Sequence, residues 1–373
     1  MPFCWNNETN LDLCLNRGKC DRLDDRCICS SACFVGNFCE INYNAVRLPM
    51  TGAIVQDAVA TRDYYIATFV ILAACGLINN ACALITFCRE RIRITAQGFY
   101  LIVFSIMSIF LMCVLVTYCL TVARLDSESY RIISCFGLPF ISLIMVDGSI
   151  LCTVAVAIER VLIESFDFAI HGSRVRSVLV SLGIIVYACG SNIDEIFLRR
   201  LTKDLEGKHI CIYDFDQYPT WRRIDIIFSY AHVIIPCFVH LICAICILTT
   251  IARRKIFIGT TNKSLVRVWM HQLNFHRDLL IPPVAVILCI LPHGILGHLL
   301  QTCIPYSDKP KLRLHIAFVL LLYVPQMLSF MLYVYPKNVY MGEFRQTFIY
   351  RIFCRCAAKK PKHHRRYLTL ERQ

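Results

Sequence analysis

Charged residues are scarce in this chain, and their scarcity excludes an ordinary soluble domain. Asp, Glu, Lys and Arg make up 17% of its 373 residues, against about a quarter in a typical soluble protein. Hydrophobic residues reach 57% and gather into long runs. Because about 20 consecutive apolar residues can cross a bilayer as a helix, the composition predicts an all-α membrane protein.

Motifs for catalysis and metal binding are missing as well. The sequence holds no metal-ligand spacing, no nucleophile elbow and no glycine-rich phosphate loop. We therefore expect no enzymatic activity, no cofactor and no bound metal. The net charge of +13 would fit nucleic-acid binding in a soluble protein. Here the basic residues crowd into short segments between apolar runs, so we expect no nucleic-acid partner.

Seven apolar runs follow residue 63, and each is near or above the length that a spanning helix needs. They cover Tyr65–Cys88, Gly98–Val122, Cys135–Ile158, Val178–Ile196, Ile224–Ile251, Leu279–Leu300 and Leu314–Tyr335. We predict a seven-transmembrane helix bundle over 64–336. A linker over 41–63 precedes it, and a cytoplasmic amphipathic helix and basic tail over 337–373 follow it.

Basic residues in the short loops set the predicted orientation. The loops after the first, third and fifth runs, and the chain after the seventh, are rich in Arg and Lys, whereas the opposite loops balance their basic residues with acids. Loops rich in Arg and Lys stay in the cytoplasm. Seven spans therefore put the N-terminus outside, and we predict a multi-pass protein of the plasma membrane.

The first 40 residues hold seven cysteines and no histidine; the cysteines are Cys4, Cys14, Cys20, Cys27, Cys29, Cys33 and Cys39. So short a segment cannot bury a sufficient core, and disulfides must stabilise it. The lack of histidine argues against a zinc knuckle. A glycosylation sequence at Asn7 also fits the cell exterior. No secretory signal precedes this segment, so we expect either that the first membrane helix translocates the N-terminus or that the sequence lacks its true start.

The stretches Cys14-Leu-Asn-Arg-Gly-Lys-Cys20, Cys27-Ile-Cys29 and Gly36-Asn-Phe-Cys39 resemble an EGF-like module over residues 1–40. The resemblance implies the disulfides Cys4–Cys20, Cys14–Cys27 and Cys29–Cys39. Cys33 is additional to the family pattern, so it is either a free thiol or the partner of another extracellular cysteine such as Cys303. The acidic signature of calcium-binding EGF modules is missing, and we expect no calcium site.

The third apolar run carries unusual residues at both ends and in its middle. Cys135 begins it, and Cys211, in the loop between the fourth and fifth runs, is a natural disulfide partner. Glu159 and Arg160 close it at the cytoplasmic end. An arginine that pairs with its neighbouring acid, or is released from it, suits a two-state switch.

A cysteine followed 25 residues later by the arginine of a Glu-Arg-Val triplet resembles the rhodopsin-like (class A) G-protein-coupled receptors. Other matches to that family are Asn80 in helix one, Pro236 in helix five, Cys289-Ile-Leu-Pro292 in helix six, and Tyr335-Pro336. The resemblance implies a receptor that transduces an extracellular ligand, such as a peptide, to a heterotrimeric G protein. It also implies that Glu159, Arg160 and Phe168 take part in coupling to the G protein.

Departures from the family pattern narrow this interpretation to a divergent member. Ser108 replaces the helix-two aspartate of the sodium site, and Ile290 replaces the helix-six tryptophan. Ser142 stands where amine receptors carry their ligand aspartate, which disfavours a monoamine. The seventh run holds no lysine for a retinal Schiff base.

Several polar residues are candidates for the ligand cavity. Asp147 is the one acid deep in the third run, and it either takes part in function or hydrogen-bonds a neighbouring helix. His293, next to a helix-six proline, has the best claim among the histidines of the apolar runs, each of which otherwise forms hydrogen bonds between helices. Asp214, Asp216 and Trp221 belong to an acidic and aromatic outer loop that suits a cationic peptide or is merely solvated. Ser142 is a further candidate, because it stands at the position where amine receptors bind their ligand.

The chain after the seventh run predicts a helix on the inner leaflet. Phe344, Phe348 and Ile352 recur at helical spacing among arginines, and Cys354 and Cys356 are candidate palmitoylation sites beside a basic patch for anionic lipid. A second class of function stays open, in which the EGF-like module mediates adhesion and the bundle anchors it. A transporter is disfavoured, because no internal repeat is visible.

Overall fold

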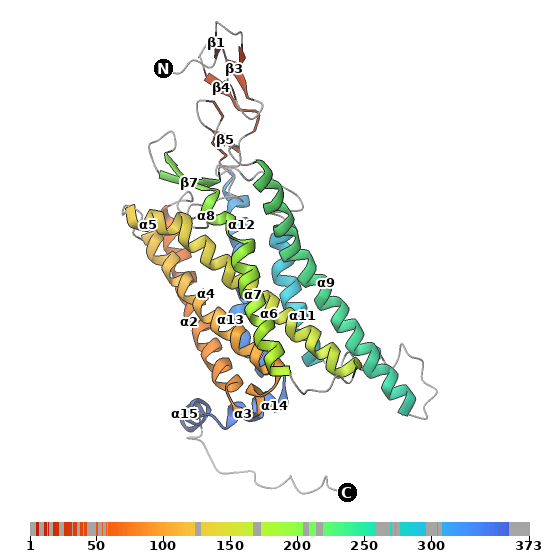
Figure 1. The fold of residues 1–373 in the computed structure, drawn as a ribbon. Helices are drawn as coiled ribbons and strands as arrows, with labels where there is room; N and C mark the ends of the chain where they lie inside the picture. The colour runs from red at the N-terminus through yellow and green to blue at the C-terminus, as the bar shows by residue number, and fades with distance from the viewer. Residues whose placement is uncertain are drawn as a thin grey trace.

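The computed structural model arranges the chain as an elongated helical bundle with a small strand-rich module at one end (Figure 1). It describes residues 5–6, 11–12, 14, 18–21, 26–31, 33–35, 38–39, 41–42, 50, 54, 57, 59–123, 128–166, 173–203, 209–213, 219–258, 269–270, 273, 277–295, 304 and 308–357. We name the two ends of the bundle the module end and the tail end. The tail end is where the last helices of the chain lie.

Five helical segments among the described residues are long and apolar enough to cross a membrane: Thr61–Phe87, Ala96–Val122, Glu128–Ser165, Arg174–Phe197 and Arg223–Ile256. They belong to α2 (Val59–Phe87), α4 (Ala96–Ala123), α5 (Glu128–Ile132) with the π-helix η2 (Ile133–Gly137) and α6 (Leu138–Phe166), α7 (Ser173–Ser191) with α8 (Asp194–Phe197), and α9 (Pro219–Ile258). The first five predicted runs are therefore long helices, as expected of a helical membrane protein.

In the described part of the chain, the sixth and seventh predicted runs form shorter helices of the same bundle. The sixth lies in α11 (Arg277–Gly294), which packs against α9. The seventh is divided into α12 (Lys309–Leu321), α13 (Val324–Met327) and the π-helix η4 (Phe330–Val334). Asp308 caps α12 by accepting a hydrogen bond of 3.3 Å from the Lys311 backbone N–H, and Lys311 holds the pKa of this carboxyl below its usual range.

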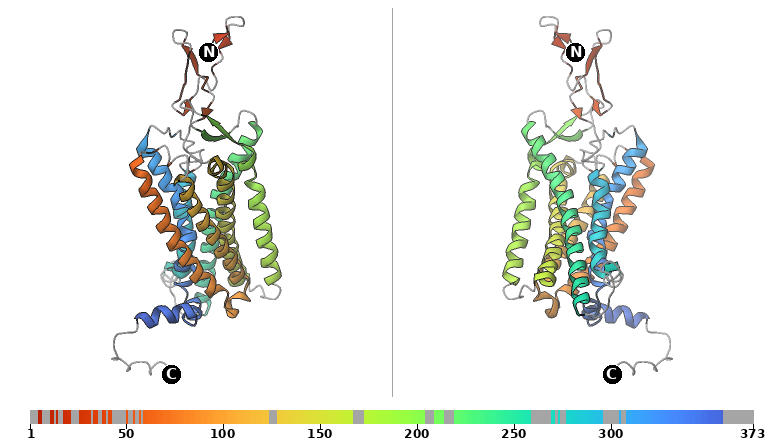
Figure 2. Two further views of the ribbon diagram at one scale, coloured as in Figure 1. Left: turned by 90° about the vertical axis from the view of Figure 1, so that its left-hand side faces the viewer. Right: turned by 90° about the vertical axis from the view of Figure 1, so that its right-hand side faces the viewer.

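Short helices lie at the tail end. They are α3 (Glu90–Arg93), α14 (Asn338–Arg345) and α15 (Phe348–Ala357), and Figure 2 shows α15 crossing the direction of the bundle. The Arg89 Nε atom lies 3.5 Å from a Glu343 carboxylate oxygen, which ties the end of α2 to α14. Phe344 is buried, whereas Phe348 and Ile352 are exposed. The structure divides the single predicted helix into α14 and α15, so Phe344 lies on another helix than Phe348 and Ile352.

The module consists of three short antiparallel hairpins. They pair β1 (Trp5–Asn6) with β2 (Leu11–Asp12), β3 (Lys19–Asp21) with β4 (Arg26–Ile28), and β5 (Phe34–Val35) with β6 (Ile41–Asn42). Such short strand pairs are not stable alone, and disulfides join Cys14 to Cys27 and Cys29 to Cys39. A fourth hairpin, β7 (Arg199–Lys203) with β8 (His209–Tyr213), covers the module end of the bundle, and β6 contacts β8.

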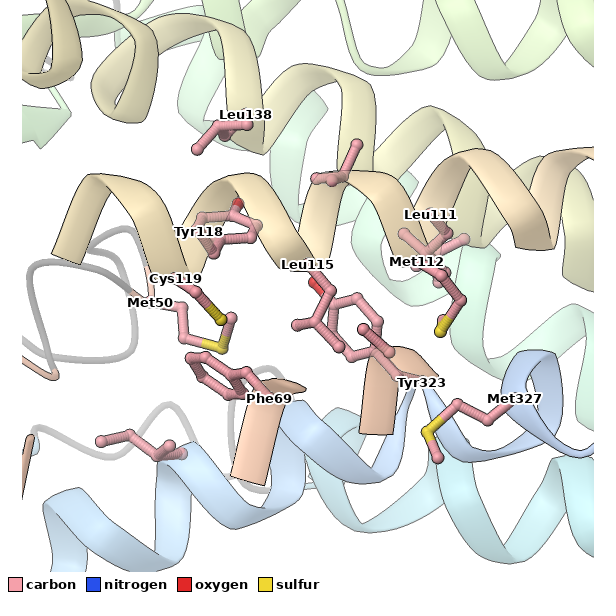
Figure 3. Packing of buried hydrophobic residues seen from close by; sticks show 14 of the residues in the cluster. Met50, Phe69, Leu111, Met112, Leu115, Tyr118, Cys119, Leu138, Tyr323 and Met327 are labelled. Atoms are coloured by element: carbon pink, nitrogen blue, oxygen red, sulfur yellow. The ribbon is translucent and has the colours of Figure 1, made fainter. Parts of the chain in front are cut away.

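Two clusters of buried residues form the core of the bundle. One lies toward the module end and includes Phe69, Leu115 and Tyr323 (Figure 3); the other includes Phe87 and Phe104 and reaches α14. The first cluster also contains Met50 and Ile54, from the stretch predicted as a linker over 41–63. That prediction is wrong in two respects, because these side chains belong to the bundle core and α2 begins at Val59 rather than after residue 63.

Candidate functional site

Glu159 and Arg160 lie near the tail end of α6, and both are buried. The ion pair that the structure forms at Glu159 is with Arg176 of α7, at 2.5 Å between Oε1 and Nη2. In this structure the ion pair of Glu159 is thus with a neighbouring helix, and the switch of Arg160 between a paired and a released state stays a prediction. Successive residues of a helix point in different directions, so Glu159 can meet α7 while Arg160 points elsewhere.

Arg160 lines a narrow cleft between α6, α9 and α11. The other lining residues are mostly apolar, among them Ile247, Leu248 and Pro283. His240 of α9 also lines it and forms a hydrogen bond of 3.0 Å to the Thr153 hydroxyl of α6. A guanidinium in a cleft with mostly apolar walls can bind carbonyl or carboxylate oxygens of an inserted peptide segment.

Asp147 lies in the middle of α6 and is buried. One of its carboxylate oxygens accepts a hydrogen bond of 2.9 Å from the Asn192 side chain and lies 3.0 Å from Nδ1 of His232 on α9. The rings of Tyr187 and Phe228 pack against His232, with centroids 5.6 and 6.1 Å away. These contacts agree with the second interpretation of Asp147, in which its carboxylate hydrogen-bonds neighbouring helices.

A second polar network joins α2 to the interrupted seventh run. Asn80 donates a hydrogen bond of 2.8 Å to the Gln326 backbone carbonyl and accepts one of 2.8 Å from the Ser329 hydroxyl. The Gln326 side chain donates in turn to Ser149 of α6, at 3.1 Å. Breaking a helix inside an apolar bundle frees backbone carbonyls that need new donors, and Asn80 supplies one.

The module end of α6 is fixed covalently. A disulfide joins Cys135, in the π-helix η2, to Cys211 of β8. The hairpin is further held by a buried ion pair of 2.5 Å between Arg199 of β7 and Glu195 of α8. The β7–β8 hairpin is thereby fastened across the bundle next to the contact with the module.

The remaining ligand-cavity candidates do not meet Asp147 in one cavity of the described structure. Ser142 is buried, donates to the Pro139 carbonyl at 2.9 Å and lies 3.4 Å from the Tyr118 hydroxyl. His293 stacks on His315, with ring centroids 5.9 Å apart. Trp221 is exposed near the start of α9. Within the residues described, no group of three or more His, Cys, Asp or Glu side chains is arranged to bind a metal ion.

The cysteines of the module follow the pairing that the EGF-like resemblance implies as far as the structure describes them. Cys20 and Cys33 are also disulfide-bonded, so the alternative of a free Cys33 is wrong. Several predicted residues lie outside the described part of the chain: Cys4, Asn7, Phe168, Asp214, Asp216 and Cys303. For Cys354 and Cys356 only the helical backbone is described.

Comparisons with known proteins leave the family open. No protein-family model matches this chain, and a comparison with curated proteins found no match.

Sequence reasoning missed the partners of its own candidates. It did not single out Arg176, Asn192 or Gln326, which bind Glu159, Asp147 and Asn80. The available signal was weak, since each is one polar residue in or beside an apolar run. Such pairs depend on which helices are neighbours in the bundle, and a single sequence does not specify the neighbours.

Proposed function

We propose that the protein is a rhodopsin-like receptor of the cell surface that transduces an extracellular ligand, with a peptide as the leading class, to a heterotrimeric G protein. The observation that carries this proposal is Arg160, buried in α6 and lining the cleft between α6, α9 and α11. The Cys135–Cys211 disulfide at the opposite end of the same helical segment supports it.

The proposed topology has seven membrane spans, with the module end outside the cell. Five long apolar helices support a membrane protein, and the disulfides of the module support an oxidising exterior. The arginines and lysines near the tail end support a cytoplasmic location for it. In this arrangement α15 lies on the inner leaflet and its exposed Phe348 and Ile352 contact lipid.

The proposed switch is a change in the cleft at Arg160. A ligand that binds better to the open state shifts the bundle toward it. When the tail ends of α9 and α11 move apart, the Arg160 guanidinium becomes accessible to a segment of the G protein. The Glu159–Arg176 ion pair holds the tail end of α6 against α7, and in this proposal that position of α6 belongs to the closed state.

Nucleotide exchange on a panel of G proteins, measured with the receptor in lipid nanodiscs and a peptide library as ligand source, tests the proposal. Arg160→Ala should abolish receptor-driven exchange. Arg174→Ala, which removes an exposed arginine at the same end of the bundle, should leave it unchanged. Full ligand-driven exchange by Arg160→Ala at normal surface expression would show that the mechanism is wrong.

Adhesion is the second candidate function, because the module stands away from the bundle and contacts it through β6 and β8 (Figure 1). Deleting residues 1–45 distinguishes the two functions. A receptor without its module retains ligand-independent nucleotide exchange, whereas an adhesion protein loses the ability to join cells.

A further inference from the structure

Three residues that precede α2 are buried at the module end of the bundle: Met50, Ile54 and Asp57, which we call the anchors. Their exposed fractions are 8%, 1% and 6%. Met50 and Ile54 belong to the core cluster of the bundle, and Figure 3 shows Met50 beside Phe69 of α2 and Cys119 of α4. Side chains of the chain itself therefore lie among the helix ends that face the module.

The spacing of the anchors explains how they reach the bundle together. Positions 50, 54 and 57 are four and three residues apart, the spacing of residues that share one face of a helix. The backbone at Met50 and Ile54 is helical, and the Asp57 N–H donates a hydrogen bond of 3.3 Å to the Ile54 carbonyl. One face thus carries two apolar side chains and an acid, all directed into the bundle.

Asp57 fastens this face to two helices. The Arg313 guanidinium of α12 donates to both of its carboxylate oxygens, at 3.0 and 3.2 Å. The Tyr65 hydroxyl of α2 donates to one of them at 3.0 Å. The Asp57 side chain is fully buried whereas that of Arg313 is half exposed, and the hydrogen bond to Asp57 raises the pKa of Arg313. Two-pronged pairing of charged groups is both strong and directional.

The same structure has Arg160 buried at the tail end, with an exposed fraction of 7%. Seated anchors and a closed tail end therefore occur together, and a bound group stabilises the state to which it binds. We infer that the anchors are a built-in ligand that stabilises the closed bundle. An extracellular ligand then acts on the EGF-like module, which immediately precedes the anchors in the chain, and withdraws them. The inference rests on the two-state bundle of the proposed function.

The native thiol of Cys243 provides a readout that needs no G protein. Cys243 is a free cysteine of α9, is 7% exposed and lines the cleft beside Arg160. Its rate of reaction with N-ethylmaleimide, followed by mass spectrometry on the full chain in nanodiscs, reports opening of the tail end. Because the exposed Cys246 lies three residues away, the background for all variants is Cys246→Ser.

Asp57→Asn is the principal variant, because it removes the charge and keeps the size of the side chain. Loss of the paired charge should shift the population of the open state, and the Cys243 labelling rate, by about tenfold. Met50→Ser combined with Ile54→Ser should act in the same direction. The matched control is Asp308→Asn, an acid-to-amide change at the start of the same α12, where the acid pairs with Lys311 at 2.7 Å. It should leave the rate unchanged.

Glu159→Gln is the positive control. It weakens the link between α6 and α7 at the tail end without touching the anchors, and it should accelerate Cys243 labelling. Unchanged labelling in Asp57→Asn and in the double serine variant, with native thermal unfolding, overturns the inference even if Arg160→Ala still abolishes nucleotide exchange. Accelerated labelling in both supports it. If no G protein then responds to any form of the receptor, the proposed function fails and the role of the anchors stands.

Discussion

The Glu159 carboxylate of α6 binds the Arg176 guanidinium of α7 at 2.5 Å, and Arg176 is half exposed while Glu159 is buried. Arg176→Ala removes the partner of a buried acid and weakens the link between the two helices. Because partly exposed ion pairs contribute about 0.2–1 kcal/mol, we expect basal nucleotide exchange to rise about two- to fivefold. Arg174→Ala, two residues earlier on α7, provides the control. A lower basal rate in Arg176→Ala, at equal expression, would contradict a role for the pair in the closed state.

Asp147, His232 and Asn192 join three helices through one carboxylate. Removing one member of a buried charged or hydrogen-bonded group leaves the others without their partner, which costs about 3–5 kcal/mol for a buried ion pair. Asp147→Ala should therefore lower the unfolding temperature strongly, and so should His232→Ala. Their combination should cost much less than the sum, because the residues share one contact. Additive losses in a double-mutant cycle would show that the two residues act independently.

The disulfide between Cys135 and Cys211 closes a loop with a sequence separation of 76 residues. Replacing both cysteines with serine should destabilise the protein by about 2–4 kcal/mol and release the β7–β8 hairpin from α6. Thermal unfolding in detergent measures the first effect, and proteolysis between β7 and β8 measures the second. Cys75→Ser, at an exposed free thiol, should change neither.

The long helices could be predicted from the sequence because the cost of leaving a backbone group unpaired in lipid forces an apolar run into a helix. The break in the seventh run could not. It depends on Asn80, 246 residues earlier, donating to the Gln326 carbonyl. Composition records the apolar character of the run but not the donor that allows it to depart from a regular helix.

Contacts between helices also limited what could be predicted about the candidate site from the sequence. Cys135 and Arg160 could be placed at the two ends of one helix from spacing alone. The partner of Glu159 could not, since the choice between Arg160 and Arg176 depends on the rotation of α6 against α7. Met50, Ile54 and Asp57 have helical spacing, but the three residues are too few to be distinguished from chance before their burial is known.

Asn80 and its neighbour Asn79 provide a matched pair for testing the contact between α2 and the interrupted seventh run. Asn80 bonds to Gln326 and Ser329 across helices, whereas the Asn79 side chain donates to the Cys75 carbonyl of its own helix. Polar contacts between membrane helices contribute about 1–2 kcal/mol, so Asn80→Ala should lower the unfolding temperature by several degrees and Asn79→Ala should not. Hydrogen exchange should also become faster at the backbone of α13 and η4 in Asn80→Ala, because Gln326 loses its donor. Equal unfolding temperatures for the two variants would mean that packing alone holds the interrupted helix against α2.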